Sequence, residues 1–478
     1  MSEHDASSER LKELGYEPEL ERRLSIRHVV GLAMADVSPT MAVVFLTAGV
    51  FLIGGTFAVG ASIIQGAVVI LIALCLAELA SMYPIAGGMY SLVRNVLPGP
   101  VTWVTMFNFL IQGIVIPASI ALGVAQFVKS LVPGLGMADQ PLALIFLGIA
   151  VVIALTRVDV GAWVTIVMVV VELAVLGIIT VAALTAPQQS VIDVAVHPVH
   201  LSGTELTGLT FVVMLATFAP AFNVINGYDA ALGFSEELKG GERSVAKAVI
   251  VSAALACVLI IIPLIAAVVA APDLKEFLSA ETPIAYSVEA ALGSAATKII
   301  DIGAAVALFN AMLSLLMYFG RAVYTTGRDV VWPAPVSRRL GRLNRFQAPA
   351  AGVLVLAVPA GVLVFTSALD FLIIFAGTVI AAVYFFIGWA ALVSRITQKE
   401  QRRVYRMPLW PVPPIIVIGF TGIALVKQEG RYILAEAVLI VLALAAWGLS
   451  KLWTSSADGA PPALGETRKA QLHGDARS

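Results

Sequence analysis

Long apolar segments, separated by short polar stretches, run through most of this sequence. A helix of about 20 apolar residues matches the thickness of a bilayer core, and a soluble core has no use for many such runs. We read twelve of them, with edges set to within a few residues: 29–53, 56–82, 101–128, 141–156, 160–184, 207–233, 245–271, 299–324, 348–366, 369–393, 411–426 and 432–453. The pattern predicts an all-α membrane protein with 12 transmembrane helices.

Two of the longest segments are interrupted near the middle by polar and helix-breaking residues. The bilayer core offers no water to unpaired backbone groups, so such breaks are tolerated only where protein or a wet cavity surrounds them. Two breaks in corresponding positions of two halves are typical of the binding site of a secondary transporter. The residues concerned are Asp36, Val37, Ser38, Pro39, Thr40 and Met41 in the first segment, and Asn223, Asn226, Gly227, Tyr228 and Asp229 in the sixth.

The first five segments and the next five share an order of features: the first of each set carries the break and the fourth is the shortest. Because five is odd, the second set enters the membrane from the opposite side, which predicts an inverted repeat. The expected organisation is an N-terminal segment 1–28, a first repeat 29–184, a second repeat 207–393, two appended helices 411–453 and a tail 454–478.

Charge fixes the expected orientation. Of the 30 Lys and Arg residues, 25 fall in the segments on the same side as the N-terminus, so the positive-inside rule predicts that both termini are cytoplasmic in a plasma (inner) membrane. Only 13% of residues are charged, against about 25% in soluble domains, and the net charge of −1 gives no indication of nucleic-acid binding. Cys75 and Cys257 both lie in apolar segments, so no disulfide framework is expected.

Two acidic residues inside the membrane need an explanation, because a charge at mid-depth costs at least about 2.5 kcal/mol. Asp36 could pair with a cationic amine of a substrate, carry a coupling proton, or cap the half-helix that begins near Ser38. Glu172 has no Lys or Arg in its own segment, so it could carry a proton or pair with a neighbouring helix. Glu78 lies near the inner end of its segment, where we expect it to reach water and serve a structural role.

The remaining polar positions divide between helix contacts and ligand contacts. Gln112, Asn310 and Ser314 are candidate substrate contacts, although polar residues in long spans more often hold helices together. Tyr228 could cover a bound ligand or pack between helices. The pair His197 and His200 offers too few ligands for a closed metal site, so no metal or cofactor is expected. No set of nucleophile, base and orienting group indicates an enzyme.

Three blocks resemble the amino acid–polyamine–organocation permease superfamily. Residues 83–90, YPIAGGMY, are similar to its P-x-A-G-G-x-Y loop after the second helix. Residues 226–239, which begin Asn-Gly-Tyr-Asp and continue to Ser-Glu-Glu-Leu-Lys, look like its G-[FY]-[DE]…EE-x-K signature. Residues 321–333 look like the R-x-x-Y-x-x-[AG]-R-D-G…P pattern that closes its eighth helix.

The resemblance implies a LeuT-like fold of five plus five inverted helices with two appended, and a substrate held between the unwound parts of the first and sixth helices. It implies that backbone N–H groups of Val37 to Met41 bind a substrate carboxylate and that carbonyls of Asn223 to Gly227 bind its amino group. It also implies inner-gate or loop contacts by Glu236 and Glu237 with Arg94 or Arg328. The chain departs from the family in its first break, which is Val-Ser-Pro-Thr in place of a Gly-rich run, and in lacking a Lys in the fifth helix.

The expected function is therefore a permease that moves an amino acid or related amine by alternating access, coupled to a proton or sodium ion. Asp36 beside the first break favours a cationic or carboxylate-free substrate such as an ethanolamine-like amine or a polyamine. The alternatives are a potassium-type cation uptake protein on the same fold and a transport-inactive sensor.

Overall fold

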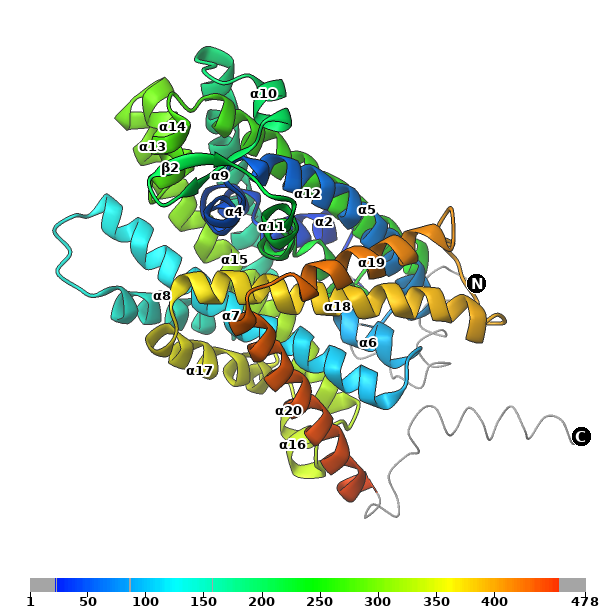
Figure 1. The fold of residues 1–478 in the computed structure, drawn as a ribbon. Helices are drawn as coiled ribbons and strands as arrows, with labels where there is room; N and C mark the ends of the chain where they lie inside the picture. Colours follow the sequence, from blue (N-terminus) through cyan, green and yellow to red (C-terminus); the bar gives the residue numbers. More distant parts are fainter. Residues whose placement is uncertain (1–21, 23, 86, 157, 455–478) are drawn as a thin grey trace, which may run out of the picture.

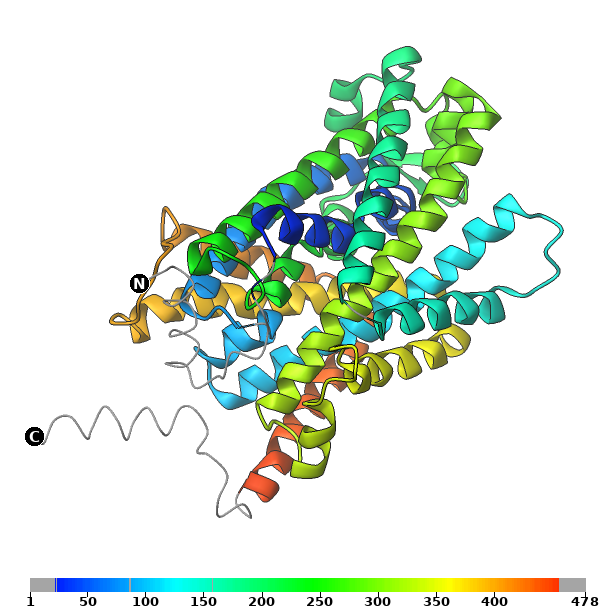
Figure 2. The same cartoon turned by 180° about the vertical axis from the view of Figure 1, so that it is seen from behind.

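The protein is a bundle of long helices in which segments far apart in the sequence lie side by side (Figure 1). The computed structural model describes residues 22, 24–85, 87–156 and 158–454. Two of the expected parts lie largely outside the described residues: the N-terminal segment 1–28, for the most part, and the tail 454–478, except for its first residue. Seen from behind, the dark-blue start of the chain lies among later helices near the middle of the bundle (Figure 2).

The bounds of the elements follow the apolar pattern closely. In the first part of the chain they are α2 Ile26–Val37, α3 Pro39–Met41, the π-helix η1 Ala42–Leu46, α4 Thr47–Gly54, the 3₁₀-helix η2 Gly55–Phe57, α5 Ala58–Met82, α6 Gly88–Arg94, α7 Gly99–Leu131, α8 Asp139–Ala154, α9 Val158–Thr185 and α10 Val191–Val196. After the strands β1 Val199–Ser202 and β2 Glu205–Gly208 come α11 Phe211–Val224, the 3₁₀-helix η3 Tyr228–Phe234, α12 Gly241–Val269, α13 Leu274–Ser279, α14 Pro283–Leu292, α15 Ser294–Arg328, α16 Ala334–Leu340, α17 Ala350–Thr366, α18 Leu369–Thr397, α19 Val412–Val426 and α20 Gly430–Thr454.

Among the described residues, eight stretches are long and apolar enough to cross a membrane, and three shorter apolar helices accompany them. The first stretch, Ile26–Met82, contains both of the first two segments expected from the sequence. The shorter helices are α8, α17 and α19, which correspond to three of the shorter segments in the sequence. The chain is thus a multi-pass helical membrane protein, and the count of twelve crossings stays a prediction.

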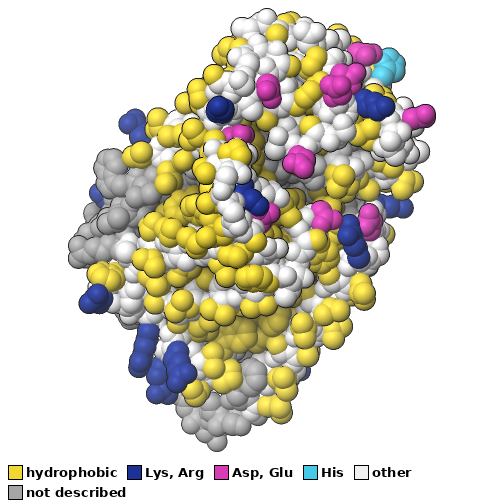
Figure 3. Space-filling view, turned by 90° about the vertical axis from the view of Figure 1, so that its left-hand side faces the viewer, with side chains coloured by type: hydrophobic (Ala, Val, Ile, Leu, Met, Phe, Trp, Pro, Cys, Tyr) yellow, Lys and Arg dark blue, Asp and Glu magenta, His cyan; other side chains and the backbone are white. Residues whose placement is uncertain are grey.

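The surface has the polarity that a bilayer requires. Large apolar side chains such as Val152, Val358 and Leu434 are about two-thirds exposed. Figure 3 shows hydrophobic side chains over a broad central area of one face, with acidic side chains gathered at the upper right and basic ones at the lower left. Polar side chains such as Gln65 and Glu172 are instead fully buried. Lipid is the solvent for this surface, so apolar groups face outward and polar groups need partners inside.

The expectation of an all-α chain is wrong in one place. Strands β1 and β2 form an antiparallel hairpin in which Val199 pairs with Gly208 and Ser202 with Glu205. Gly203, with φ 64°, opens the two-residue turn between them, and hairpin turns favour glycine at such positions. The last two residues of the hairpin, Thr207 and Gly208, are the first two of the expected sixth segment. The helix there begins only at Phe211, after Thr210, whose side chain caps it.

Candidate functional site

The first interruption lies between α2 and α3. Ser38 adopts a left-handed conformation with φ 41°, and Pro39 follows without an N–H group. A left-handed non-glycine residue is strained, and the proline removes one bond of the helical ladder. Carbonyls at the end of α2 and amides at the start of α3 therefore lack their usual helical partners. The break is confirmed at the predicted residues.

Side chains from two other helices hold this break in place. The Ser38 hydroxyl lies 2.8 Å from Glu172 Oε2 in α9 and 3.1 Å from the Ala307 carbonyl in α15. Thr40 donates to the Glu172 carbonyl oxygen at 2.9 Å, and Asn310 Nδ2 donates to Glu172 Oε1 at 2.9 Å. The sequence left two roles open for Glu172, a proton carrier and a contact with a neighbouring helix. These hydrogen bonds show the contact with neighbouring helices.

The hydrogen bonds of this cluster can form whether Glu172 is protonated or ionised. Ser38 has one hydroxyl hydrogen but two acceptors, so it donates either to Glu172 or to the Ala307 carbonyl. When Glu172 is ionised it accepts from Ser38. When it is neutral it can donate to Ser38, which then donates to Ala307.

The second interruption lies between α11 and η3. The α-helix ends at Val224, Gly227 is left-handed with φ 93°, and the chain continues as a 3₁₀-helix from Tyr228. Two side chains tie the break to α18, where Asn223 Nδ2 donates to the Ile373 carbonyl at 3.1 Å and Asn226 Oδ1 accepts from the Tyr384 hydroxyl at 2.8 Å. The second break is also confirmed.

The two breaks lie against each other. A Cβ added at Gly227 would lie 2.7 Å from the Val37 nitrogen and 2.8 Å from the Asp36 carbonyl carbon. Backbone meets backbone here, which is possible only because Gly227 carries no side chain. Segments 190 residues apart in the chain thus bring the ends of their interrupted helices to one place.

Two buried carboxyl groups flank this contact. Asp36 and Asp229 are 4% and 2% exposed and lie close enough to interact electrostatically. The Tyr318 hydroxyl donates to Asp229 Oδ2 at 2.9 Å, and Ser314 lies beside the Asp36 carboxyl. Asp36 Oδ1 has no hydrogen-bond partner. A buried acceptor without a donor has a cost of about 1–3 kcal/mol, which a bound cationic or donor group would remove.

Other predicted site residues lie in different surroundings. Tyr228 is fully buried and stacks on Tyr384 with ring centroids 6.2 Å apart, so its interhelical-packing role is the one observed. Gln112 donates to the Asn108 carbonyl in its own helix, so its observed bond is to α7 and not to either break. Asn310 contacts the site through Glu172.

The predicted gating residues lie together, and one of the expected pairs, Glu236 with Arg328, is present. Arg328 makes two bonds to Glu236, at 2.8 and 3.3 Å. Glu237 is 3.4 Å from Arg321, and Arg94 pairs with Asp329 in place of either glutamate. These pairs join the segment after η3 to the end of α15 and to α6.

The chain just before α2 also joins this region. Leu24 forms a parallel β-bridge with Leu238, with hydrogen bonds from Leu24 N to Glu237 O at 3.0 Å and from Lys239 N to Leu24 O at 2.8 Å. The start of the first interrupted helix and the end of the second are thus hydrogen-bonded to each other on one side of the bundle.

Glu78 does not reach water as we expected, because it is fully buried. It accepts two bonds from Arg395 at 2.7 and 2.6 Å and one from the Met407 backbone amide at 2.7 Å, and Arg403 lies 3.3 Å away. The loop after α18 folds over the end of α5 and shields the carboxylate. Its role is structural, as predicted, for a different physical reason.

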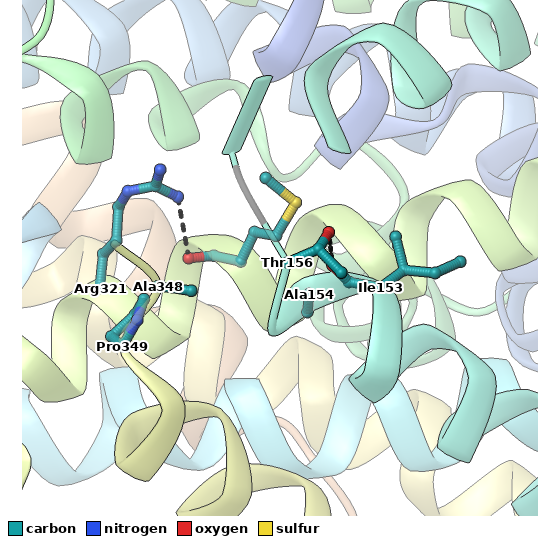
Figure 4. A pocket seen from close by; sticks show the side chains of 7 residues that line it. Ile153, Ala154, Thr156, Arg321, Ala348 and Pro349 are labelled. Carbon is teal, nitrogen blue, oxygen red and sulfur yellow. Dashed lines mark hydrogen bonds between the residues drawn. The ribbon is translucent and has the colours of Figure 1, made fainter. Parts of the chain in front are cut away.

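A small pocket of about 10 Å³ lies away from both breaks (Figure 4). Its lining residues are Ile153, Ala154, Thr156, Met317, Arg321, Ala348 and Pro349. Arg321 points toward the Met317 carbonyl, 3.3 Å away, and the space holds about one water molecule. The pocket contains no residue of either break. Among the described residues, no cluster of three His, Cys, Asp or Glu side chains suits a metal ion.

Sequence reasoning missed two tyrosines at the site. Tyr318 follows Asn310 and Ser314 at steps of four residues, so all three lie on one face of α15, and that spacing was a usable signal. Tyr384 sits in an apolar run of α18 with no neighbouring polar residue to distinguish it. Both reach the second break, through Asp229 and Asn226 respectively.

Comparison with known proteins agrees with the geometry. The family model described as "Amino acid permease" matches residues 24–450. The branched-chain amino acid permease BcaP of Lactococcus lactis subsp. cremoris is 24% identical over 369 residues, which cover 73% of this chain and 77% of the relative. The methylthioribose transporter of Bacillus subtilis is 25% identical, with 73% and 76% covered. An uncharacterized transporter of Mycobacterium tuberculosis is 26% identical, with 80% and 81% covered.

The match spans both interrupted helices, the intervening hairpin and α19, and extends into α20. These features and the extent of the family match lead to one assignment: the chain belongs to the amino acid permease family, within the amino acid–polyamine–organocation superfamily.

Proposed function

We propose that this permease carries an amino acid or a related amine by alternating access, with the substrate bound where the two helix breaks meet. The observation that carries the proposal is the contact of Gly227 with Val37 and Asp36, which brings the ends of the two interrupted helices and a buried acceptor without a donor to one point. The twelve-span, five-plus-five inverted arrangement with cytoplasmic termini is part of this proposal, supported by the matching positions of the breaks and the charge distribution.

The ends of the interrupted helices suit both ends of an amino acid. The helix ends at Val37 and Val224 present partial negative charge, and the stretch that starts at Pro39 presents partial positive charge. An ammonium group is favoured at the former and a carboxylate at the latter. Asp36 adds a full negative charge near Val37, so we favour a substrate with an amine and with either no carboxylate or an additional cationic group.

The conformation described here is closed. Asp36, Ser38 and Asp229 are each less than 5% exposed, and the ion pairs of Glu236 with Arg328 and of Glu237 with Arg321 close the side where the segment 235–239 lies. A substrate can reach the site only after helices move apart, as alternating access requires. Glu172 is the residue that we propose to carry the coupling proton, because its bonds to Ser38 and Asn310 can be rearranged on protonation.

An uptake panel in proteoliposomes tests the proposal. Radiolabelled amino acids, amines and polyamines, and rubidium as a potassium substitute, are tried with and without proton and sodium gradients. We expect uptake of one amine-bearing class, driven by the proton gradient and lost in Asp36→Asn. Asp370→Asn, which removes a half-exposed carboxylate at the start of α18, is the matched control and keeps uptake.

Three results would contradict the proposal. Uptake of rubidium alone would favour cation uptake, and ligand-induced thermal stabilisation without any uptake would favour a sensor. Normal uptake kinetics in Asp36→Asn would remove Asp36 from the site.

A further inference from the structure

A further buried carboxyl lies in α20, a helix that contains no residue of either break. Glu436 is 8% exposed and sits within the membrane-spanning stretch Gly430–Leu452. Among the described residues, no Lys or Arg forms an ion pair with it, and its Oε2 atom has no hydrogen-bond partner. A carboxyl group is costly at this depth, so its presence needs a reason that the substrate site does not supply.

Glu436 ends a row of polar side chains that starts in the turn before α20. Gln428 lies in the turn before α20, Tyr432 in its first turn, and Glu436 four residues later on the same face. We call these three residues the α20 polar row. Tyr432 is 2% exposed and stacks on Phe371 of α18, and Gln428 accepts a bond from Thr378 of α18. The row therefore faces the protein and not the lipid.

The partner of the row is α7, which runs antiparallel to α20. Gly99 near the start of α7 lies 3.0 Å, as measured from an added Cβ, from Trp447 Nε1 near the end of α20. Asn108 is nine residues into α7 and Glu436 is eleven residues before Trp447, so at about 1.5 Å per residue the two come level. The Asn108 side chain does lie beside the Glu436 carboxyl.

Four polar atoms along this seam have no hydrogen-bond partner: Gln428 Nε2, the Tyr432 hydroxyl, Glu436 Oε2 and Asn108 Oδ1. Each carries the desolvation cost of a buried polar group if it stays unpaired. Three of these atoms follow one face of α20 from the preceding turn inward, and the fourth faces Glu436 from α7. Bridging water satisfies buried polar groups in such places, and each water needs two to four polar partners.

We propose that Glu436 is a proton-binding site, reached by water along the α20 polar row from the membrane face on which the turn before α20 lies. In its neutral form the carboxyl can donate to Asn108 Oδ1 and pack against α7. In its ionised form it needs more water, which loosens the contact between α20 and α7. Protonation of Glu436 thus links the pH on one side of the membrane to the packing of α20 on α7. Helix α7 also contacts α15.

Glu436 is the acidic residue that lies within the contact between α20 and the helices α7 and α18; the other charged groups of these helices lie near the helix ends. On α20 itself Tyr432 lies one turn away, and Arg431 is half exposed and paired with Glu429. On α18 the nearest acidic group, Asp370, lies at the outer end of the row beside Arg431. The remaining charged groups on these three helices lie near the C-terminal ends of their own helices: Lys129 on α7, Arg395 on α18 and Lys451 on α20.

Infrared spectroscopy of the protein reconstituted in lipid tests the proposal without any substrate, so its outcome is independent of the proposed transport function. A protonated buried carboxyl gives a resolved C=O stretching band. Asp36, Glu172 and Asp229 are also buried, so the spectrum of Glu436→Gln is subtracted from that of the unaltered protein to remove their contribution. We expect the difference to contain one band that disappears as the pH is raised between about 4 and 9. Glu429→Gln, which removes an exposed carboxylate from the same turn, is the matched control and keeps the band.

The water route has its own test. In D₂O the band shifts as the proton exchanges, and we expect the exchange to slow at least tenfold in Tyr432→Phe combined with Gln428→Leu. The absence of a band from the difference spectrum, or a difference band that does not respond to pH, would overturn the site. Unchanged exchange of that band in the double variant would overturn the route. If thermal unfolding shows that Glu436→Gln does not fold, Glu436→Asp is used, and the expected result is a displaced band that still titrates.

Discussion

Replacing Gly227 by alanine tests whether the two helix breaks truly depend on contact. The added Cβ would lie 2.7 Å from the Val37 nitrogen, whereas ordinary contacts begin at 3.4 Å, so the breaks must separate by about 0.7 Å. The left-handed conformation of an alanine costs about 1–2 kcal/mol, and forcing an extra carbon into a packed interior costs about 1–3 kcal/mol. We expect Gly227→Ala to lower the free energy of unfolding by about 2–5 kcal/mol.

The same displacement should also impair transport. A misplacement of about 1 Å in groups that must converge on a ligand can reduce a rate by about a hundredfold. We therefore expect uptake in proteoliposomes to fall by roughly tenfold to a hundredfold. The assay compares initial uptake rates at equal protein incorporation, together with thermal unfolding in detergent.

Two other glycines serve as controls that separate the conformational cost from the steric cost. Gly203 also has a positive φ, 64°, but a Cβ there meets nothing within 4 Å, so Gly203→Ala should carry only the conformational cost. Gly148, in α8, has open space and ordinary helical geometry, and Gly148→Ala should be neutral or slightly stabilising. If Gly227→Ala unfolds like Gly203→Ala and transports normally, the reasoning about touching breaks is refuted.

Three further changes follow from the contacts. Glu172→Gln should keep the fold, because it can still bond to Ser38, but uptake should lose its dependence on the proton gradient; retention of that dependence would exclude Glu172 as the proton carrier. Glu78→Ala should lower the free energy of unfolding by about 3–5 kcal/mol, because it leaves the Arg395 cation without its buried partner. Denaturation in detergent measures this, and an unchanged value would show that the pair is dispensable. Glu236→Gln should weaken the contact with Arg328 and favour opening of that side, measured as faster labelling of a cysteine introduced nearby, and equal labelling rates would argue against a gating role.

The residues at the breaks could be predicted because their effect is local. A proline, a left-handed glycine and polar groups within an apolar run interrupt a helix wherever that helix finally packs. Ser38, Pro39 and Gly227 therefore lie at breaks in the structure, as the sequence predicted. The short lengths of α8, α17 and α19 were likewise visible in the apolar pattern.

The partners of those residues could not be predicted. Ser38 and Glu172 are separated by 134 positions, and Asp229 and Tyr318 by 89, and no periodicity in either segment indicates which helices will be neighbours. The same limit explains why Glu78 was expected to reach water: the loop that buries it lies more than 300 residues later. The hairpin escaped notice because its few residues adjoin a long apolar run.

By itself, the sequence determined that this chain is a membrane protein, where two of its helices are interrupted, and that Asp36 and Glu172 lie in the interior. Hydrophobicity and backbone stereochemistry act over a few residues, so they can be read in order along the chain. The tertiary structure alone decided that Gly227 meets Val37, that Glu172 holds the first break, and that Glu436 lies against α7. Such contacts depend on how whole helices pack, and packing is settled by the combined shape of many side chains across the bundle.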